Sequence, residues 1–143
     1  MQDLLSIPFK KIKPEAYAPA YCHRGDAALD LRICEPVTVM PGELKLVKLG
    51  FAMELPSGFC AKIIGRSGLT LKGFIVLPGL VDETYRGEIG VLCYNKLGSD
   101  FTFAAGARIA QMLVEQTNLV RFHEVTDLTD TERGDHGFGS SGV

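Results

Sequence analysis

Short apolar runs separated by turn residues make up the middle of the chain. In one of them Leu44 and Leu46 alternate with Glu43, Lys45 and Val47, which is the two-residue period of a strand. Similar runs, each beside a turn that contains glycine, cover residues 59–65, 88–94, 101–103 and 107–116. Short strands at this spacing predict an all-β sandwich or barrel.

Two segments depart from the strand pattern. Residues 66–73, with the sequence RSGLTLKG, predict one short helix that ends at Gly73. From about Asp127 the chain is polar, rich in glycine and without apolar period, which is typical of a flexible segment. We therefore predict one β-rich domain over residues 1–126 and a flexible C-terminal arm over residues 127–143.

The composition narrows the classes of partner. The 143 residues fit a single domain, and their formal net charge is −2. Because the chain has no strong basic excess, neither nucleic acid nor an anionic membrane is expected as the main partner. An anionic ligand would need a local cluster of arginines and backbone N–H groups.

The cysteines and the first residues of the chain bear on its location. Cys22, Cys34, Cys60 and Cys93 are widely scattered and lack zinc-binding spacing, which indicates reduced thiols in an intracellular protein, cytoplasmic or nuclear. Residues 1–17 contain no long apolar run, so we expect neither a secretion signal nor a membrane span.

Two stretches carry polar groups that strand packing does not require. Asp30 lies between two leucines, where a carboxylate needs a partner, although an edge or turn-capping aspartate is the simpler explanation. Arg66, Ser67 and Gly68 open the predicted helix and offer a guanidinium, a hydroxyl and free N–H groups to a phosphate. Such a triplet also occurs by chance in ordinary loops.

Residues 78–88 predict a hairpin, because they form a turn between two apolar runs. Main-chain donors and acceptors at its tip would be able to read the edge of a planar ligand. Asp82 and Tyr85 lie in this turn, where one would serve as a base and the other as a stacking or steric wall. A solvent-exposed hairpin with ordinary polar residues would have the same pattern.

The last two candidates lie in a strand and in the arm. Gln111 lies in an apolar run, where a hydrogen-bonded core or edge residue is the simpler explanation. In the arm, Arg133 is suited to hold an anion and Phe138 to stack on a ring. The glycines around them allow the backbone to approach a ligand closely.

Taken in order, these stretches resemble the five sequence motifs of the trimeric dUTP pyrophosphatases. The resemblance covers residues 26–142, and GLVDETYRGE and RGDHGFGSSG are close to the family forms. It implies a jelly-roll-like β-barrel or sandwich, a β-clip, and a homotrimer with active sites at its subunit interfaces. It also implies Mg²⁺-dependent hydrolysis of dUTP to dUMP and pyrophosphate, which keeps uracil out of DNA and supplies dUMP for thymidylate synthesis.

The resemblance also implies a role for each candidate residue. Asp30 would hold water molecules on Mg²⁺, and Asp82 would activate the attacking water. Tyr85 would pack under the deoxyribose, while the backbone of Gly79, Leu80 and Val81 would read uracil. The remaining candidates would cover the base (Phe138) or contact the phosphates (Arg66, Ser67, Gly68, Gln111, Arg133, Gly139 and Ser140).

Other functions stay open on the sequence alone. A dCTP deaminase shares this fold, although Asp82 with Tyr85 and the arginine in the glycine-rich tail favour the pyrophosphatase. The triplet Arg-Gly-Asp occurs at residues 24–26 and 133–135, which would suit a binding or signalling module without catalytic activity. A family member that has lost its activity and kept a regulatory role is a third alternative.

Overall fold

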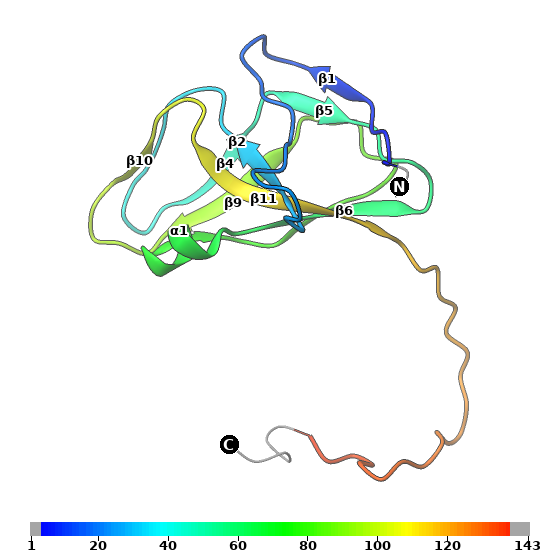
Figure 1. Cartoon of the computed structure of the whole chain (residues 1–143). Helices are drawn as coiled ribbons and strands as arrows, with labels where there is room; N and C mark the ends of the chain where they lie inside the picture. Colours follow the sequence, from blue (N-terminus) through cyan, green and yellow to red (C-terminus); the bar gives the residue numbers. More distant parts are fainter. Residues whose placement is uncertain (1–3, 138–143) are drawn as a thin grey trace.

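The computed structural model describes residues 4–137 (Figure 1). Apart from one short helix, their regular secondary structure consists of β-strands. Its strands are β1 (Phe9–Lys11), β2 (Leu29–Arg32), β3 (Val37–Val39), β4 (Leu44–Lys48), β5 (Phe51–Met53), β6 (Phe59–Ile64), β7 (Phe74–Val76), β8 (Gly79–Val81), β9 (Gly90–Asn95), β10 (Phe101–Phe103) and β11 (Arg108–Gln116). The one helix of this part is α1 (Ser67–Leu71). The predicted all-β class and the short helix are therefore confirmed. No helix among residues 4–137 is long and apolar enough to cross a membrane.

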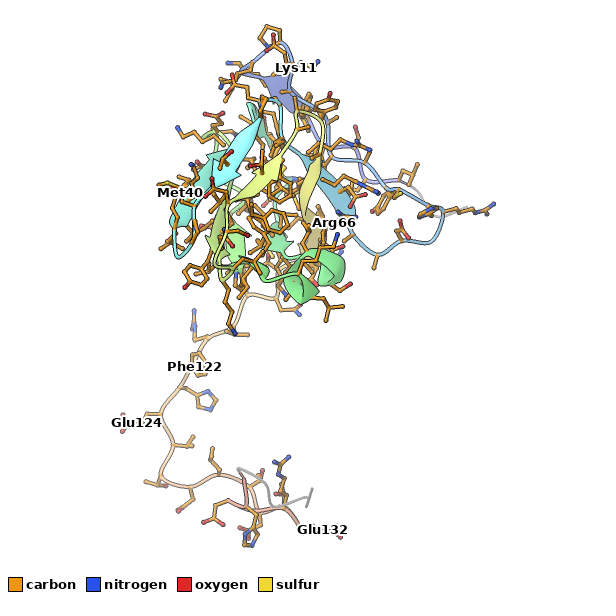
Figure 2. All side chains as sticks on the ribbon, turned by 90° about the vertical axis from the view of Figure 1, so that its left-hand side faces the viewer. Lys11, Met40, Arg66, Phe122, Glu124 and Glu132 are labelled. Atoms are coloured by element: carbon orange, nitrogen blue, oxygen red, sulfur yellow. The ribbon has the colours of Figure 1, made fainter. Side chains whose placement is uncertain are left out.

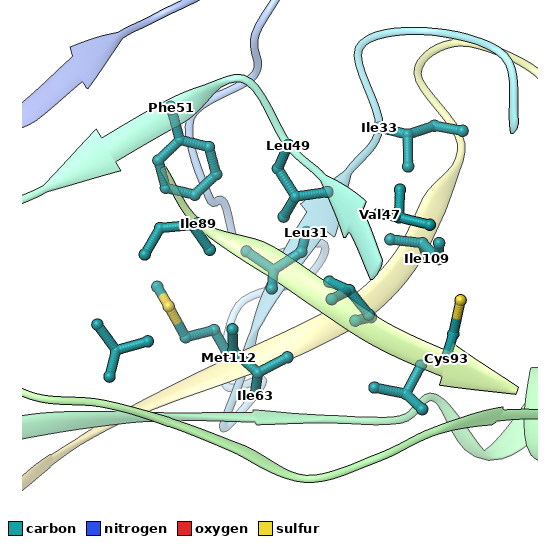
Figure 3. Packing of buried hydrophobic residues seen from close by; sticks show 14 of the residues in the cluster. Leu31, Ile33, Val47, Leu49, Phe51, Ile63, Ile89, Cys93, Ile109 and Met112 are labelled. Atoms are coloured by element: carbon teal, nitrogen blue, oxygen red, sulfur yellow. The ribbon is translucent and has the colours of Figure 1, made fainter. Parts of the chain in front are cut away.

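The strands form two larger sheets and two short pairs. One larger sheet has the order β2-β11-β6-β8 and the other the order β4-β9-β7, while β1 pairs with β5 and β10 with β3. Figure 3 shows Leu31, Ile63 and Met112 of the first larger sheet in one buried cluster with Val47 and Cys93 of the second. The core of the β-sandwich is therefore built from both sheets.

One face of the second larger sheet is apolar and exposed. Val47 of β4 is buried, whereas its neighbours Leu44 and Leu46 on the opposite face of the strand are each 58% exposed. Leu46 lies opposite Leu92 of β9, which is exposed as well. The two-residue alternation of this strand therefore places its leucines on the outside of the sandwich and its valine in the core.

The prediction of a hairpin over residues 78–88 is wrong. β8 pairs with β6, with Gly79 opposite Ile63, whereas β9 lies between β4 and β7 in the other larger sheet. Residues 82–89 therefore cross from one sheet to the other. The turn residues indicated correctly that the chain reverses, but hydrogen-bonding partners elsewhere in the chain decide which strands pair.

The chain leaves the sandwich after β11. Figures 1 and 2 show residues 117–137 extending away from the sheets, and every residue of this segment is exposed. Five large apolar side chains in it are exposed, and two of them, Leu119 and Phe122, are 96% and 94% exposed. The segment therefore presents apolar surface that its own sandwich does not cover.

Asn95 is the one fully buried polar side chain in the described part of the chain. Its Nδ2 donates to the carbonyl oxygens of Val39 at 2.9 Å and Ser99 at 2.8 Å. Its Oδ1 accepts from the N–H of Leu97 at 2.9 Å. The amide thus connects the end of β9 to β3 and to the turn before β10.

We expect Asn95→Leu to destabilise the fold by about 1–3 kcal/mol, because a leucine of similar size leaves the buried carbonyl of Val39 without its donor. Chemical denaturation of the variant and the parent protein measures the free energy of unfolding. Ser99→Ala is the matched control, since Asn95 contacts the backbone of Ser99 and the substitution changes only the side chain. Equal stability of Asn95→Leu and the parent protein would contradict the assigned role.

Candidate active site

A large cavity with a polar lining lies on the outer face of the four-stranded sheet. It has a volume of about 580 Å³ and is lined by residues of β2, β6, β11 and the start of α1. We call it the arginine cavity, after Arg66 and Arg108, which both line it. Asp30, Ser67, Gly68 and Gln111 line it too, so the first, second and fourth predicted stretches converge at one place.

Strand register explains this convergence. In the four-stranded sheet Gln111 of the central strand β11 lies opposite Asp30 of β2 on one side and Ile64 of β6 on the other. Residues directly opposite each other on neighbouring strands present their side chains on the same face. The sheet therefore places Asp30 and Gln111 side by side, and β6 leads from there directly to Arg66.

Asp30 is held between two guanidinium groups. Its Oδ2 accepts from Arg108 at 3.1 Å, and its Oδ1 lies 3.6 Å from Nε of Arg66. Arg66 also donates to the carbonyl oxygen of Arg108 at 3.1 Å. The Asp30 side chain is only 13% exposed, so its charge is largely shielded from water. Together the three groups carry an excess of positive charge.

Arg108 was not among the residues that the sequence predicted, although it lies in the same stretch as Gln111. The hydrogen bond to Asp30 raises the pKa of Arg108, and its contact with Sγ of Cys22, at 3.0 Å, adds to this effect. The sequence signal that could have identified Arg108 is a charged residue directly before the apolar pair Ile109-Ala110. Only the register with β2 identifies its carboxylate partner.

The start of α1 is shaped as the sequence predicted. Arg66 is still extended, with φ −98° and ψ 128°, and its carbonyl oxygen accepts from Leu69 and Thr70. The N–H groups of Ser67 and Gly68 come before these first helical donors, and such groups have no partner within a helix. Figure 2 shows Arg66 beside this turn of helix.

Gln111 supports the turn that leads into the helix. Its Nε2 donates to the carbonyl oxygen of Gly65 at 2.8 Å, which joins β11 to the residue just before Arg66. The residue is half-buried and lines the arginine cavity. The side chain therefore has a structural partner as well as a place in the candidate site.

A second cavity, of about 300 Å³, lies at the edge of the sandwich. It is lined by residues of β4, β6, β8 and β9 and by the crossing loop, and we call it the sheet-edge cavity. It brings together the third predicted group: Gly79, Leu80, Val81, Asp82 and Tyr85. Ile63 lines this cavity and Ile64 lines the arginine cavity, so the two open on opposite faces of β6.

The crossing loop orders its own polar groups. The phenol of Tyr85 donates to the carbonyl oxygen of Glu88 at 3.0 Å. The N–H of Tyr85 donates to the carbonyl oxygen of Asp82 at 3.1 Å. The carboxylate of Glu88 accepts from the N–H of Gly50 at 3.0 Å and lies 3.5 Å from Nζ of Lys48. Asp82 is exposed, and its carboxylate is open to a ligand in the sheet-edge cavity.

Residues 133–137, the described part of the fifth predicted stretch, line neither of these two cavities. Arg133 lies on the exposed segment after β11, where its Nε donates to the carbonyl oxygen of His136 at 3.0 Å. Phe138, Gly139 and Ser140 lie outside the described residues. Of the two Arg-Gly-Asp triplets, the first lies in a loop that lines the arginine cavity through Asp26.

Comparison with known proteins identifies the relatives of this chain. The family model described as dUTPase matches residues 15–142. A deoxyuridine 5'-triphosphate nucleotidohydrolase of Trichodesmium erythraeum is 43% identical over 142 residues, which is 97% of this chain and 100% of that protein. The chain belongs to the dUTPase family. A second dUTPase relative, from Crocosphaera subtropica, is 46% identical over the same shares of the two chains.

The fold agrees with that of solved dUTPases. The structure of the Staphylococcus bacteriophage 80alpha dUTPase with dUpNHpp has a TM-score of 0.90 to this chain. The alignment covers 96% of this chain and 99% of the phage chain at 24% identity. The predicted jelly-roll-like β architecture is therefore confirmed, because the sheets superpose on those of a dUTPase.

Proposed function

We propose that this protein is a dUTP diphosphatase, which hydrolyses dUTP to dUMP and pyrophosphate. Two relatives at 43% and 46% identity are named deoxyuridine 5'-triphosphate nucleotidohydrolases. The observation that carries the proposal is the convergence of Asp30, Arg66 and Gln111, from three separate stretches, in one cavity. In the cell this reaction keeps uracil out of DNA and supplies dUMP for thymidylate synthesis.

The arginine cavity binds the phosphates. Arg66 and Arg108 together outweigh the single charge of Asp30, so the cavity attracts an anion. The hydroxyl of Ser67 and the N–H groups of Ser67 and Gly68 contribute donors at the start of α1. Gln111 contacts the phosphates from the centre of the sheet.

The same residues fit a magnesium ion that is held mainly by phosphate oxygens and water. Residues 4–137 contain no group of three or more His, Cys, Asp or Glu side chains arranged to bind a metal directly. Asp30 accepts one hydrogen bond, from Arg108, and forms an ion pair with Arg66; a carboxylate has about four acceptor sites, so it can also accept from metal-bound water. Bound Mg²⁺ would neutralise phosphate charge.

Asp82 acts as the general base. It accepts a proton from a water molecule whose oxygen attacks the α-phosphorus in line with the leaving group. The new P–O bond forms as the bond from the α-phosphorus to the bridging oxygen breaks, and pyrophosphate leaves with the bonding electrons. Asp82 suits this role because its carboxylate is exposed beside the sheet-edge cavity.

The sheet-edge cavity selects the nucleoside. The backbone of Gly79, Leu80 and Val81 reads the polar edge of uracil, and a mismatched base leaves polar groups unpaired. Tyr85 packs under the deoxyribose, where its ring leaves no room for a 2'-hydroxyl. We therefore expect dUTP to be preferred over dCTP, dTTP and UTP.

The protein acts as a homotrimer with active sites at the subunit interfaces. On one chain the phosphate residues and Asp82 lie in two cavities that open on opposite faces of β6. A complete site therefore needs the arginine cavity of one subunit beside the sheet-edge cavity of another. The exposed leucines of β4 and β9 offer apolar surface for such contacts.

The arm over residues 127–143 covers the bound nucleotide, while residues 1–126 form the catalytic domain. Arg133 is exposed on the segment after β11 and, once the arm folds over the site, holds a phosphate. Phe138 stacks on the uracil, and Gly139 with Ser140 forms a turn over the phosphates. An arm of this kind excludes water and completes the site only when the substrate is present.

The alternatives fit the observations less well. A dCTP deaminase would release ammonia, and the relatives are named for hydrolysis of deoxyuridine triphosphate instead. The carboxylate of Asp26 in the first Arg-Gly-Asp triplet accepts from the N–H of His23 at 2.8 Å and lines the arginine cavity, so the nucleotide site accounts for it. We place the enzyme in the cytoplasm or nucleus, where deoxynucleotides are used.

The reaction is tested by measuring pyrophosphate released from dUTP, with Mg²⁺ and with EDTA in its place. We expect release that depends on Mg²⁺, and we expect Asp82→Asn to lower kcat by roughly 10²–10⁴-fold while dUTP still binds, because only the base is lost. Asp100→Asn, which changes an exposed carboxylate elsewhere, is the control. Near-normal kcat in Asp82→Asn would refute the assignment of the base.

The shared site is tested by mixing two inactive variants, Arg66→Ala and Asp82→Asn. In mixed trimers some interfaces pair an intact arginine cavity with an intact Asp82, so about one quarter of the sites should regain function after random exchange of subunits. Pyrophosphate release from dUTP measures the recovery. If mixing restores no activity beyond that of the separate variants, each site lies within one chain.

The arm is tested with a protein that ends at Glu132. We expect its kcat for dUTP to fall by at least about tenfold, because the lid is missing. Its thermal midpoint should change little, because residues 133–137 of the removed segment are all exposed. A protein that fails to fold after this truncation would show that the arm is structural.

A further inference from the structure

Gly87 provides the space in which the ring of Tyr85 lies. A Cβ atom built on Gly87 would come within 2.5 Å of Cζ and 2.8 Å of Cε2 of Tyr85, and closer still to the phenol oxygen. The φ angle of Gly87 lies outside the left-handed region, so other residues are able to adopt this backbone. The position therefore requires glycine because of the room that the ring occupies.

The ring is also held at its polar end. Its phenol donates to the carbonyl oxygen of Glu88 at 3.0 Å. The side chain of Glu88 is only 16% exposed and is fixed by the N–H of Gly50 at 3.0 Å. The carbonyl oxygen that accepts the hydrogen bond from the phenol thus belongs to Glu88, whose side chain is bound to the turn between β4 and β5. The ring itself lies against Gly87.

A side chain at position 87 would move the ring rather than break the fold. Tyr85 is 46% exposed, so one side of its ring faces solvent and is free to swing outward. Outside the adjacent residues, the three atoms nearest to a new Cβ all belong to the side chain of Tyr85. The substitution therefore displaces the ring of Tyr85 and leaves the rest of the fold in place.

We infer that Gly87 is a positioning residue that sets the discrimination between deoxyribose and ribose through the ring of Tyr85. The inference rests on the proposed function, in which Tyr85 packs under the deoxyribose. A ring pushed toward solvent leaves room for a 2'-hydroxyl, so Gly87→Ala should admit UTP. The turnover of dUTP should suffer less, because Asp82 and the arginine cavity are unchanged.

The experiment compares kcat/KM for dUTP and UTP in four variants: Gly87→Ala, Tyr85→Ala, the double variant and Gly98→Ala. We expect the ratio of dUTP to UTP to fall by at least about tenfold in Gly87→Ala and in Tyr85→Ala. The double variant should match Tyr85→Ala, because Gly87 acts only through the ring. Gly98→Ala is the matched control, since a Cβ there has no neighbour within 4 Å.

A second measurement does not depend on activity. The chain has four tyrosines, and in protein labelled with 3-fluorotyrosine the ¹⁹F signal of Tyr85 is assigned by its loss in Tyr85→Phe. We expect Gly87→Ala to shift this signal and Gly98→Ala to leave it in place. An unshifted signal would overturn the inference, whether or not the protein hydrolyses dUTP.

The outcomes separate the inference from the proposed function. If Tyr85→Ala lowers the ratio and Gly87→Ala does not, the inference is wrong and the role of Tyr85 stands. If Tyr85→Ala leaves the ratio unchanged, both the role of Tyr85 and the inference are wrong. If the parent protein releases no pyrophosphate from dUTP, the proposed function fails, and the inferred effect on sugar choice fails with it.

Discussion

The ionic contacts between Asp30, Arg66 and Arg108 are the constraint on which the arginine cavity depends. They join β2, β11 and the residue before α1, and Asp30 and Arg108 are 78 residues apart in the sequence. Without the carboxylate, two guanidinium groups would face each other in a partly buried site and repel. The same carboxylate lets a cavity built to attract anions exist before any anion arrives.

Much of the fold was predictable because its exposed strands alternate polar and apolar residues. The run before Gly50 shows this period, and Gly73, with φ 88°, ends the helix as expected. β5 was not predicted, because Phe51, Ala52 and Met53 are all buried and so show no alternation. The partners of β8 were also hidden, because pairing with β6 depends on contacts distant in sequence.

The sequence proposed candidate members of the site but did not show how they are arranged. Arg66 stood out because a guanidinium beside free N–H groups suits a phosphate, and Asp30 and Gln111 because polar groups in apolar runs need partners. Their roles and that of Asp82 came from the resemblance to the family. That Arg108 completes the cluster follows from the register between β2 and β11, which no local pattern records. The candidates are divided between two cavities because the cavities open on opposite faces of β6, where Ile64 lines one and Ile63 lines the other.

The crossing loop has a mechanical consequence. Since β8 and β9 belong to different sheets, residues 82–89 form a strap whose two ends are fixed to opposite layers of the sandwich. Any sliding of one layer over the other changes the span of this strap and with it the placement of Asp82 and Tyr85. Repacking of the core between the layers is thereby transmitted to the sheet-edge cavity, which the core residues Ile63, Val81 and Ile89 also line.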